Sequence, residues 1–129
     1  QPAYVAWKNR IITTVMRDRE LRTEFARLRQ FLGNAADIGK EALDFMIQSA
    51  GASLVNRASA RIYARLRQEG LSAKFVLQIH DQLVLECPES EAESVKAIVV
   101  EEMERPFLYH GKPRRIPVEA TIGPDFGAV

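Results

Sequence analysis

The sequence predicts an α+β fold in which a small antiparallel sheet packs with a long amphipathic helix. Two patterns carry this prediction. Between residues 38 and 69 apolar residues recur at steps of three and four, the period of a helix. Around residues 75–87 apolar and polar residues alternate in two short runs, the period of strands. Helices and hairpins that follow one another along the chain are typical of an antiparallel sheet with helices.

Length and composition place the chain among globular proteins. Its 129 residues are 47% hydrophobic, and 18 Lys and Arg nearly balance 17 Asp and Glu. The one cysteine, Cys87, excludes an internal disulfide. No apolar run approaches the ~18 residues of a membrane span and no export signal is present, so we expect a cytoplasmic protein with no membrane partner. Because residue 1 is Gln rather than Met, we expect a piece of a longer polypeptide.

The first elements are a helix and a short hairpin. Apolar residues at roughly helical spacing predict a helix over residues 2–18. Residues 20–23 and 27–31 then suit two strands joined by a short turn. Because strand side chains alternate, Arg27 and Arg29 project from the same side of this hairpin.

Charge is unevenly distributed along the chain. Residues 1–40 carry eight Lys and Arg against four Asp and Glu, whereas residues 86–104 carry seven Glu against Lys96. The basic region suits a polyanion and the acidic region would be repelled by one. Both regions could equally be solvated faces.

The next element is the longest. Gly33 and Asn34 interrupt the chain, Asp37 is the expected N-cap, residues 38–69 form the helix, and Gly70 suits a C-terminal cap. The arginines of its later turns are expected to be solvated: Arg57, Arg61, Arg65 and Arg67. One continuous apolar stripe is expected to consist of Leu43, Ile47, Ala50, Leu54, Ala58, Ile62 and Leu66.

A second hairpin, a helix and a final strand complete the prediction. The strands 75–80 and 83–87 flank a tight connection. Ser90, with a Glu three residues later, predicts a capping box that opens a helix closing before residue 106. Residues 116–122 alternate as a last strand, at a sheet edge because Pro117 has no amide hydrogen to donate.

The polar pair His80 and Asp81 lies where the two apolar strands meet. One interpretation is an ordinary hairpin turn in which the Asp81 side chain bonds its own backbone. The other is a chemical site, because histidine is an uncommon turn former and suits hydrogen bonding or metal binding. The residues alone leave both interpretations open.

Residues 77–86, Leu-Gln-Ile-His-Asp-Gln-Leu-Val-Leu-Glu, resemble the third catalytic motif of the DNA polymerase I family (family A), in which a hydrophobic strand delivers His-Asp to a hairpin turn. Further segments resemble motifs of the same family in the same order. They are the base of the fingers helix (2–7), the basic Thr-x-x-Gly-Arg-x-Arg hairpin (22–29), the palm helix with the phage-type Gln-Ser-Ala-Gly-Ala (41–54) and the closing strand (116–126). The resemblance covers essentially the whole chain.

This resemblance implies a division of the chain and a function. Residues 1–33 would be the end of the fingers helix and the basic hairpin, and residues 34–129 the C-terminal segment of the palm subdomain. The implied activity is template-directed DNA synthesis, a two-metal nucleotidyl transfer by a phage-type DNA polymerase in the cytoplasm of a bacterium or infected host cell.

The resemblance also implies site residues and partners. Asp81 would be catalytic and bind Mg²⁺, and His80 would be catalytic by supporting the primer end. The residues expected to contact DNA are Arg27, Arg29, Lys40, Asp44, Gln48 and Gln78. The implied partners are primer–template DNA, dNTP and the remaining N-terminal polypeptide of the polymerase.

Departures from the family pattern shape the expected activity. Gln82 stands where the family usually has Glu, and Asp44 where it often has Asn. No segment resembles the first motif, Asp-Tyr-Ser-x-Ile-Glu, which supplies the other catalytic aspartate, or the fingers helix that binds the nucleotide. Because one aspartate cannot hold two metals, we expect the chain to be inactive alone. The alternative is a non-catalytic nucleic-acid-binding or assembly module derived from a palm.

Overall fold

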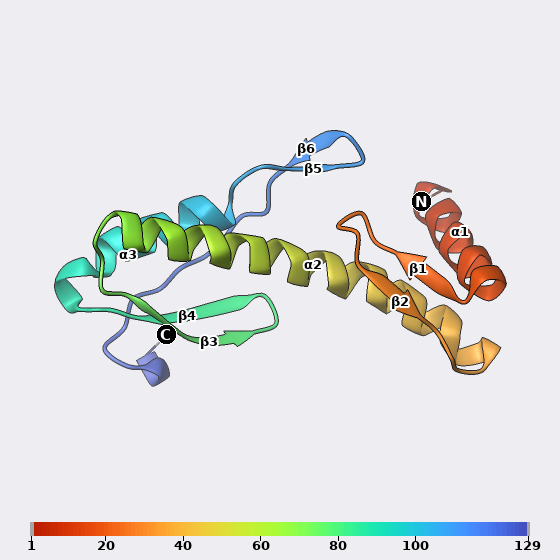
Figure 1. Cartoon of the computed structure of the whole chain (residues 1–129), viewed down its shortest axis with the longest axis horizontal. Helices are drawn as coiled ribbons and strands as arrows, with labels where there is room; N and C mark the ends of the chain where they lie inside the picture. The colour runs from red at the N-terminus through yellow and green to blue at the C-terminus, as the bar shows by residue number, and fades with distance from the viewer. Residues whose placement is uncertain (1, 129) are drawn as a thin grey trace. The chain divides into compact units, whose positions relative to one another are not determined.

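The computed structural model describes residues 2–128 and has the α+β architecture that the sequence predicts (Figure 1). Its elements follow in the order α1 (Pro2–Asp18), β1 (Glu20–Arg22), β2 (Leu28–Gln30), α2 (Ala35–Gln68), β3 (Lys74–Ile79), β4 (Gln82–Glu86), η1 (Glu89–Glu91), α3 (Ala92–Met103), β5 (Phe107–Tyr109), β6 (Lys112–Arg114) and η2 (Phe126–Ala128). No helix among them has both the length and the apolar surface that crossing a bilayer requires.

The strands form three separate antiparallel pairs, β1 with β2, β3 with β4 and β5 with β6. The antiparallel pairing that the sequence predicts is confirmed, but in the residues described it is divided among three two-stranded sheets. Each pair joins strands that are consecutive in the chain, and the strands are only three to six residues long. Because isolated two-stranded pairs are marginal in water, each one depends on packing against a helix or a neighbouring chain.

The chain divides into two compact units, Gln1–Ser53 and Leu54–Val129, and the boundary falls inside α2. This division follows packing. It does not test the functional division at residue 33, which stays a prediction.

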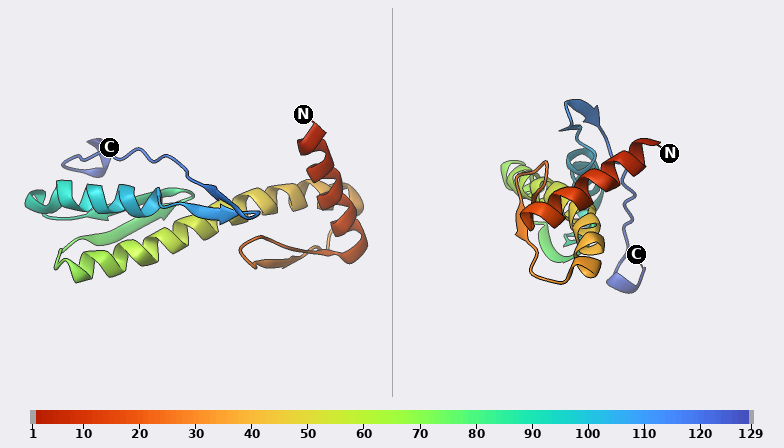
Figure 2. Two further views of the ribbon diagram at one scale, coloured as in Figure 1. Left: turned by 90° about the horizontal axis from the view of Figure 1, so that it is seen from above. Right: turned by 90° about the vertical axis from the view of Figure 1, so that its right-hand side faces the viewer.

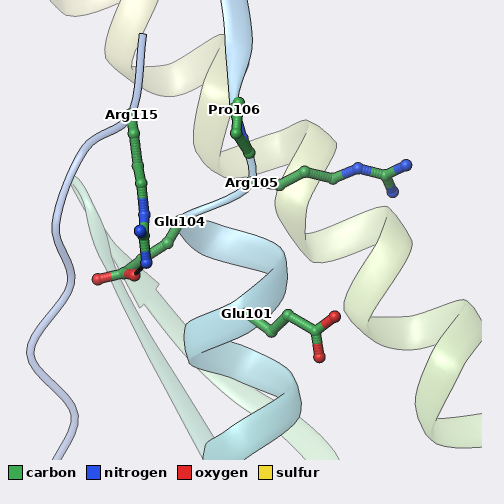
Figure 3. A pocket seen from close by; sticks show the side chains of 5 residues that line it. All are labelled: Glu101, Glu104, Arg105, Pro106 and Arg115. Atoms are coloured by element: carbon green, nitrogen blue, oxygen red, sulfur yellow. Dashed lines mark hydrogen bonds and ion pairs between the residues drawn. The ribbon is translucent and has the colours of Figure 1, made fainter.

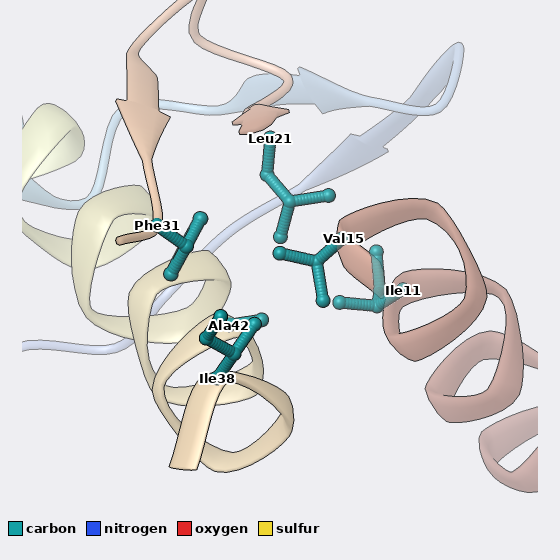
Figure 4. Close-up of a cluster of buried hydrophobic side chains, with 6 residues drawn as sticks. All are labelled: Ile11, Val15, Leu21, Phe31, Ile38 and Ala42. Atoms are coloured by element: carbon teal, nitrogen blue, oxygen red, sulfur yellow. The ribbon is translucent and has the colours of Figure 1, made fainter. Parts of the chain in front are cut away.

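A buried apolar cluster holds the first unit together (Figure 4). The residues of this cluster come from α1, β1, the end of the first hairpin and the start of α2. They are Ile11, Val15, Leu21, Phe31, Ile38 and Ala42. Trp7 packs against this cluster from α1, so it serves as a core residue. Complete burial of a branched or aromatic side chain contributes about 1.5–3 kcal/mol, which makes this small cluster the main source of order in the unit.

A second buried cluster joins the later turns of α2 to α3. Its members are Ala58, Ile62, Leu66, Val95, Ile98 and Val99. The inward side chains of the β3–β4 hairpin pack against it, and Figure 2 shows that hairpin and α3 beside the later turns of α2. This cluster gives the hairpin a rigid support.

Helix α2 begins and ends at identifiable caps. The Asn34 side chain accepts hydrogen bonds from the backbone N–H groups of Ala36 and Asp37, at 3.0 and 3.1 Å. Asn34 is thus the N-cap and the prediction of Asp37 is wrong, because Asp37 already lies in the first turn, where its carboxylate accepts from Asn34 Nδ2 at 2.6 Å. At the other end Gly70 has a φ of +70°, as a glycine cap requires.

The apolar stripe of α2 is not continuous. Ile47 is 63% exposed, whereas Ser49 and Ser53 are buried, and the Ser53 hydroxyl donates to the backbone oxygen of Ser49 at 2.8 Å. Residues before Ser49 face the first core cluster and residues after Ser53 face the second. The helix therefore serves two cores, which a single stripe would not do.

The entry to α3 also differs from the prediction. The N-cap is Glu91, which makes no side-chain cap hydrogen bond, and Ser90 lies within the 3₁₀ turn η1. The capping box of Ser90 and Glu93 is therefore wrong. Pro88, at a φ of −56°, is the N-cap of η1, which precedes the helix. The Glu91 carboxylate instead accepts from the backbone N–H of Ser72 at 2.8 Å.

The expected strand at residues 116–122 is absent from the described chain, which has no ladder partner beside it. The N–H of Val118 instead donates to the Glu104 carboxylate at 2.9 Å. The hairpin β5–β6 precedes this segment and was not predicted, because Phe107, Leu108 and Tyr109 do not alternate in polarity and Pro113 argues against a strand.

Candidate active site

The β3–β4 hairpin presents the polar pair that the sequence singles out. Leu77 pairs with Val84 and Ile79 with Gln82, and a register irregularity lies between Phe75 and Leu77. His80 and Asp81 form the two-residue turn between the strands, as predicted. Side chains on the inward face pack against the second core cluster. The turn therefore lies at the end of two paired strands that the core holds in place.

The turn holds His80 in an unusual backbone conformation. Its φ is +53°, and both His80 and Asp81 are exposed. Tight hairpin turns favour Gly, Asn or Asp where φ is positive, because a larger side chain is strained there. Strain of this kind is frequent at functional sites, where the surrounding structure maintains it. The Asp81 carboxylate makes no ion pair or side-chain hydrogen bond within residues 2–128.

The outward face of β3 is apolar. Val76, Leu77 and Ile79 are among the large hydrophobic residues exposed in this chain. A polar turn next to exposed apolar strand residues differs from an ordinary surface hairpin, whose outward face is polar. The hairpin therefore exposes apolar side chains beside its polar turn.

The described residues do not make a complete metal site by themselves. Residues 2–128 contain no group of three or more His, Cys, Asp and Glu side chains placed to hold a metal ion. Mg²⁺ is usually held by one or two carboxylates together with waters and phosphates. Asp81 fits the part of one such carboxylate, and no catalytic step on a metal follows from this chain alone.

Gln78 lies on β3 close to the turn, and its side-chain amide donates to the Asn56 side chain of α2 at 3.4 Å. Asn56 was not predicted as a site residue. Its position could have indicated it, because residues 48, 52 and 56 follow at four-residue steps and so share a helix face with Gln48. The contact ties the strand that leads to the turn to α2.

The basic hairpin β1–β2 holds one of its two predicted arginines in place. The Arg29 guanidinium lies over the rings of Phe31 and Phe45, 4.9 and 5.8 Å from their centroids, and pairs with the Glu41 carboxylate at 2.9 Å. A phosphate would compete with the Glu41 carboxylate for the N–H groups of this guanidinium. Arg27 is exposed; its backbone N–H donates to the Thr23 hydroxyl at 3.1 Å, and its backbone oxygen accepts from the Thr23 N–H at 2.8 Å.

The remaining predicted DNA contacts share one face of α2. Lys40, Asp44 and Gln48 follow at four-residue steps and all three are exposed. They belong to the first unit, whereas His80, Asp81 and Gln78 belong to the second. Each set is thus assembled within its own unit, and their roles stay predictions.

Helices α2 and α3 are joined by an ion-pair network that the sequence did not indicate. Arg61 binds the Glu102 carboxylate at 2.9 Å and its backbone oxygen at 2.6 Å. Arg65 pairs with Glu101 at 2.7 Å and Glu69 at 3.1 Å. The expectation of solvated arginines is therefore wrong for Arg61 and Arg65, because carboxylates of α3 lie against them.

The pKa of Glu102 is lowered although only 7% of the residue is exposed. Burial by itself would raise the pKa, but the hydrogen bonds from Arg61 and Arg65, with the charges of Arg61 and Arg105, outweigh it.

Burial and the charge of Glu91 raise the pKa of the Cys87 thiol, so this cysteine is not activated as a nucleophile.

A shallow hollow of about 460 Å³ lies at the end of α3, lined by Glu101, Glu104, Arg105, Pro106 and Arg115 (Figure 3). Arg115 extends toward Glu104 and pairs with it, while Arg105 and Glu101 point away. Glu101 pairs with Arg65, and Arg105 lies 3.6 Å from Glu102. Because each charged side chain that lines it has an oppositely charged partner, this hollow is a structural feature.

Comparison with known proteins gives a consistent result. The model of DNA polymerase family A matches residues 3–127. Over 120 residues the chain is 30% identical to DNA polymerase I of Aquifex aeolicus, which covers 93% of this chain and 20% of that protein. Over 82 residues it is 35% identical to the thermostable DNA polymerase I of Thermus thermophilus, which covers 64% of this chain and 9% of that protein.

A solved structure shows the same fold. The POL domain of Pol1 from M. smegmatis, in complex with DNA primer-template and dNTP, matches with a TM-score of 0.73 at 22% identity. The match covers 89% of this chain and 21% of that one. The chain thus spans between 9% and 20% of the length of the curated relatives named above.

Proposed function

Since the chain belongs to DNA polymerase family A, we propose that it acts in template-directed DNA synthesis as the C-terminal palm segment of a phage-type polymerase. Its substrates would be primer–template DNA and dNTP. Its activity would require the remaining N-terminal part of the polymerase, which carries the other catalytic aspartate.

One observation carries this proposal: the Asp81 carboxylate is exposed at a tight turn whose strands pack on a buried core. Phosphoryl transfer depends mainly on positioning and on stabilising charge, so its carboxylates must be held by rigid elements. A free carboxylate at a supported turn meets that requirement. The positive φ of His80 supports the same function, because backbone strain of this kind is frequent at functional sites.

Other residues of the chain would hold the nucleic acid. His80 would support the primer end, and Gln78 and Gln48 would meet the primer–template. Arg27 and Arg29 would bind phosphates, with Lys40 and Asp44 beside Gln48 on the exposed face of α2. Arg29 would exchange Glu41 for a phosphate on binding.

Mg²⁺ is the cofactor that we propose. When bound, it would stabilise the charge of the transferring phosphoryl group. Asp81 would contribute one carboxylate to its site, and the other ligands would come from outside this chain.

The test is reconstitution. The chain is mixed with the N-terminal part of a family A polymerase that carries the first motif, and Mg²⁺-dependent primer extension is measured. We expect extension from the mixture and none from either part alone. Asp81→Asn should lower the rate of extension at least about 10²-fold, because the transition state loses several kcal/mol of stabilisation.

Glu86→Gln is the matched control, because Glu86 is an exposed carboxylate at the far end of the same hairpin. It should leave the rate unchanged. Equal extension by Asp81→Asn and the unchanged chain would contradict the catalytic role and favour a non-catalytic binding or assembly module.

A further inference from the structure

We propose that the β5–β6 hairpin is a second contact of this chain with the DNA backbone, separate from the basic hairpin β1–β2. Residues 105–115 contain four Lys and Arg and no Asp or Glu. This segment was not among the predicted site residues. The inference rests on the proposed function, because it assumes that the chain binds DNA.

Two of the four cations are neutralised at the base of the hairpin. Arg115 pairs with Glu104, and Arg105 lies 3.6 Å from Glu102. Lys112 and Arg114 are exposed on β6 and make no ion pair or side-chain hydrogen bond within residues 2–128. The charge available to a partner therefore lies on these two side chains.

The register of the hairpin places both cations on one face. Lys112 lies opposite Tyr109 and Arg114 opposite Phe107, so the two cations and the two half-buried aromatic residues share one face of the hairpin. His110 and Gly111, with φ of +49° and +73°, form a tight turn that fixes this register. Leu108, 67% exposed, lies on the other face opposite Pro113.

The spacing of the two cations suits a nucleic-acid backbone. Side chains two residues apart on a strand lie about 6.6 Å from each other. One DNA strand carries a phosphate about every 3.4 Å along the helix axis, so Lys112 and Arg114 would span about two nucleotides of one strand. Two unpaired cations at this spacing can contact neighbouring phosphates of one strand at the same time.

The test measures DNA binding by the whole 129-residue chain as a function of salt. The probes are a blunt DNA duplex and the same duplex with a single-stranded template overhang. Each phosphate contact contributes about 0.9 to the slope of log Kobs against log salt concentration on duplex DNA. The double variant Lys112→Gln with Arg114→Gln should therefore make the slope shallower by about 1.8.

Two further double variants serve as controls. Lys74→Gln with Lys96→Gln makes the same change in net charge elsewhere in the second unit and should leave the slope unchanged. Lys112→Arg with Arg114→Lys retains both charges and should retain the slope. Circular dichroism establishes that each variant is folded.

The outcomes separate this inference from the proposed function. If the unchanged chain binds neither DNA, this inference fails, whereas the proposed function fails only if the reconstituted mixture does not extend a primer. If it binds DNA and the Lys112 and Arg114 double variant has the unchanged slope, only this inference fails. A loss seen with the overhang alone would assign the contact to the single-stranded template, and a loss with both probes to the duplex. A loss of binding to anionic phosphatidylserine vesicles, with DNA binding intact, would instead assign the hairpin to a lipid surface.

Discussion

Glu102 shows how one residue can join two helices. Its carboxylate is almost completely buried and accepts from Arg61, whose second hydrogen bond goes to the backbone oxygen of the same residue. Removing one partner of a buried pair leaves the other charge poorly compensated. Because Arg61 retains some contact with solvent, the penalty is smaller than for a fully buried pair.

We therefore predict that Glu102→Gln lowers the free energy of unfolding by about 2 kcal/mol at neutral pH, since the pair loses its charge while the side-chain size is kept. Urea unfolding monitored by circular dichroism measures this. Glu101→Gln is the matched control, because Glu101 is the exposed neighbour and exposed pairs contribute little. Equal destabilisation by the two substitutions would contradict the role of burial.

The pH dependence of that stabilisation has a definite direction. The pKa of Glu102 in the folded chain lies below its ordinary value of 4.5. Its contribution is therefore complete above pH 4.5 and is lost as the pH falls through the lower folded value. The pKa of Glu104 is also lowered, by the Val118 N–H and by Arg115, so Glu102→Gln should remove only part of the acid dependence.

At the scale of the element, the C-terminal cap at Gly70 determines where helix α2 ends. Leu71 donates from its backbone N–H to the oxygen of Leu66 at 2.9 Å, and Gly70 to that of Arg67 at 3.2 Å. This pattern requires the positive φ of Gly70. Space is not the constraint, because a Cβ at Gly70 would meet nothing within 4 Å.

We predict that Gly70→Ala destabilises the chain by about 1 kcal/mol, since an L side chain is strained at this φ. Gly51→Ala offers a control of opposite sign: Gly51 lies inside α2, and its Cβ would also meet nothing within 4 Å. It should stabilise by about 0.5–1 kcal/mol, because Ala forms helix better than Gly. Thermal unfolding of both variants compares them, and the same sign for both would contradict this explanation of the cap.

At the scale of the whole chain, two small cores share the burial. Ile38 is completely buried in the first and Ile62 in the second, and both lie on α2. A cavity left by a buried Ile costs about 2–5 kcal/mol, which is large against the marginal stability of a small unit. A substitution in one core should therefore increase local unfolding mainly in the elements that pack against that core.

We predict that Ile38→Ala increases amide hydrogen exchange mainly in α1 and the β1–β2 hairpin, and that Ile62→Ala does so mainly in α3 and the β3–β4 hairpin. Hydrogen exchange followed by mass spectrometry measures both. The two variants are matched controls for each other, because the same side chain is shortened on the same helix. Uniform exchange changes across the chain in both would show that the units unfold as one.

Local elements could be predicted from the sequence, because they depend on residues a few positions apart. The helices, the first two hairpins, the cap at Gly70 and the turn at His80 and Asp81 are all confirmed. Where a nearby group competed, the prediction failed: Asn34 caps α2 in place of Asp37, and the turn after Pro88 displaces the capping box of Ser90.

The sequence by itself determined the α+β class, the resemblance to one polymerase family and the turn that presents Asp81, since each depends on short-range pattern. Only the tertiary structure decided that the strands form separate pairs, that residues 116–122 have no ladder partner in the described chain, and that Glu102 and Asn56 make long-range contacts. The physical reason is that such contacts depend on which distant segments bury surface against each other. The periodicity of residues along the chain does not determine which segments these are.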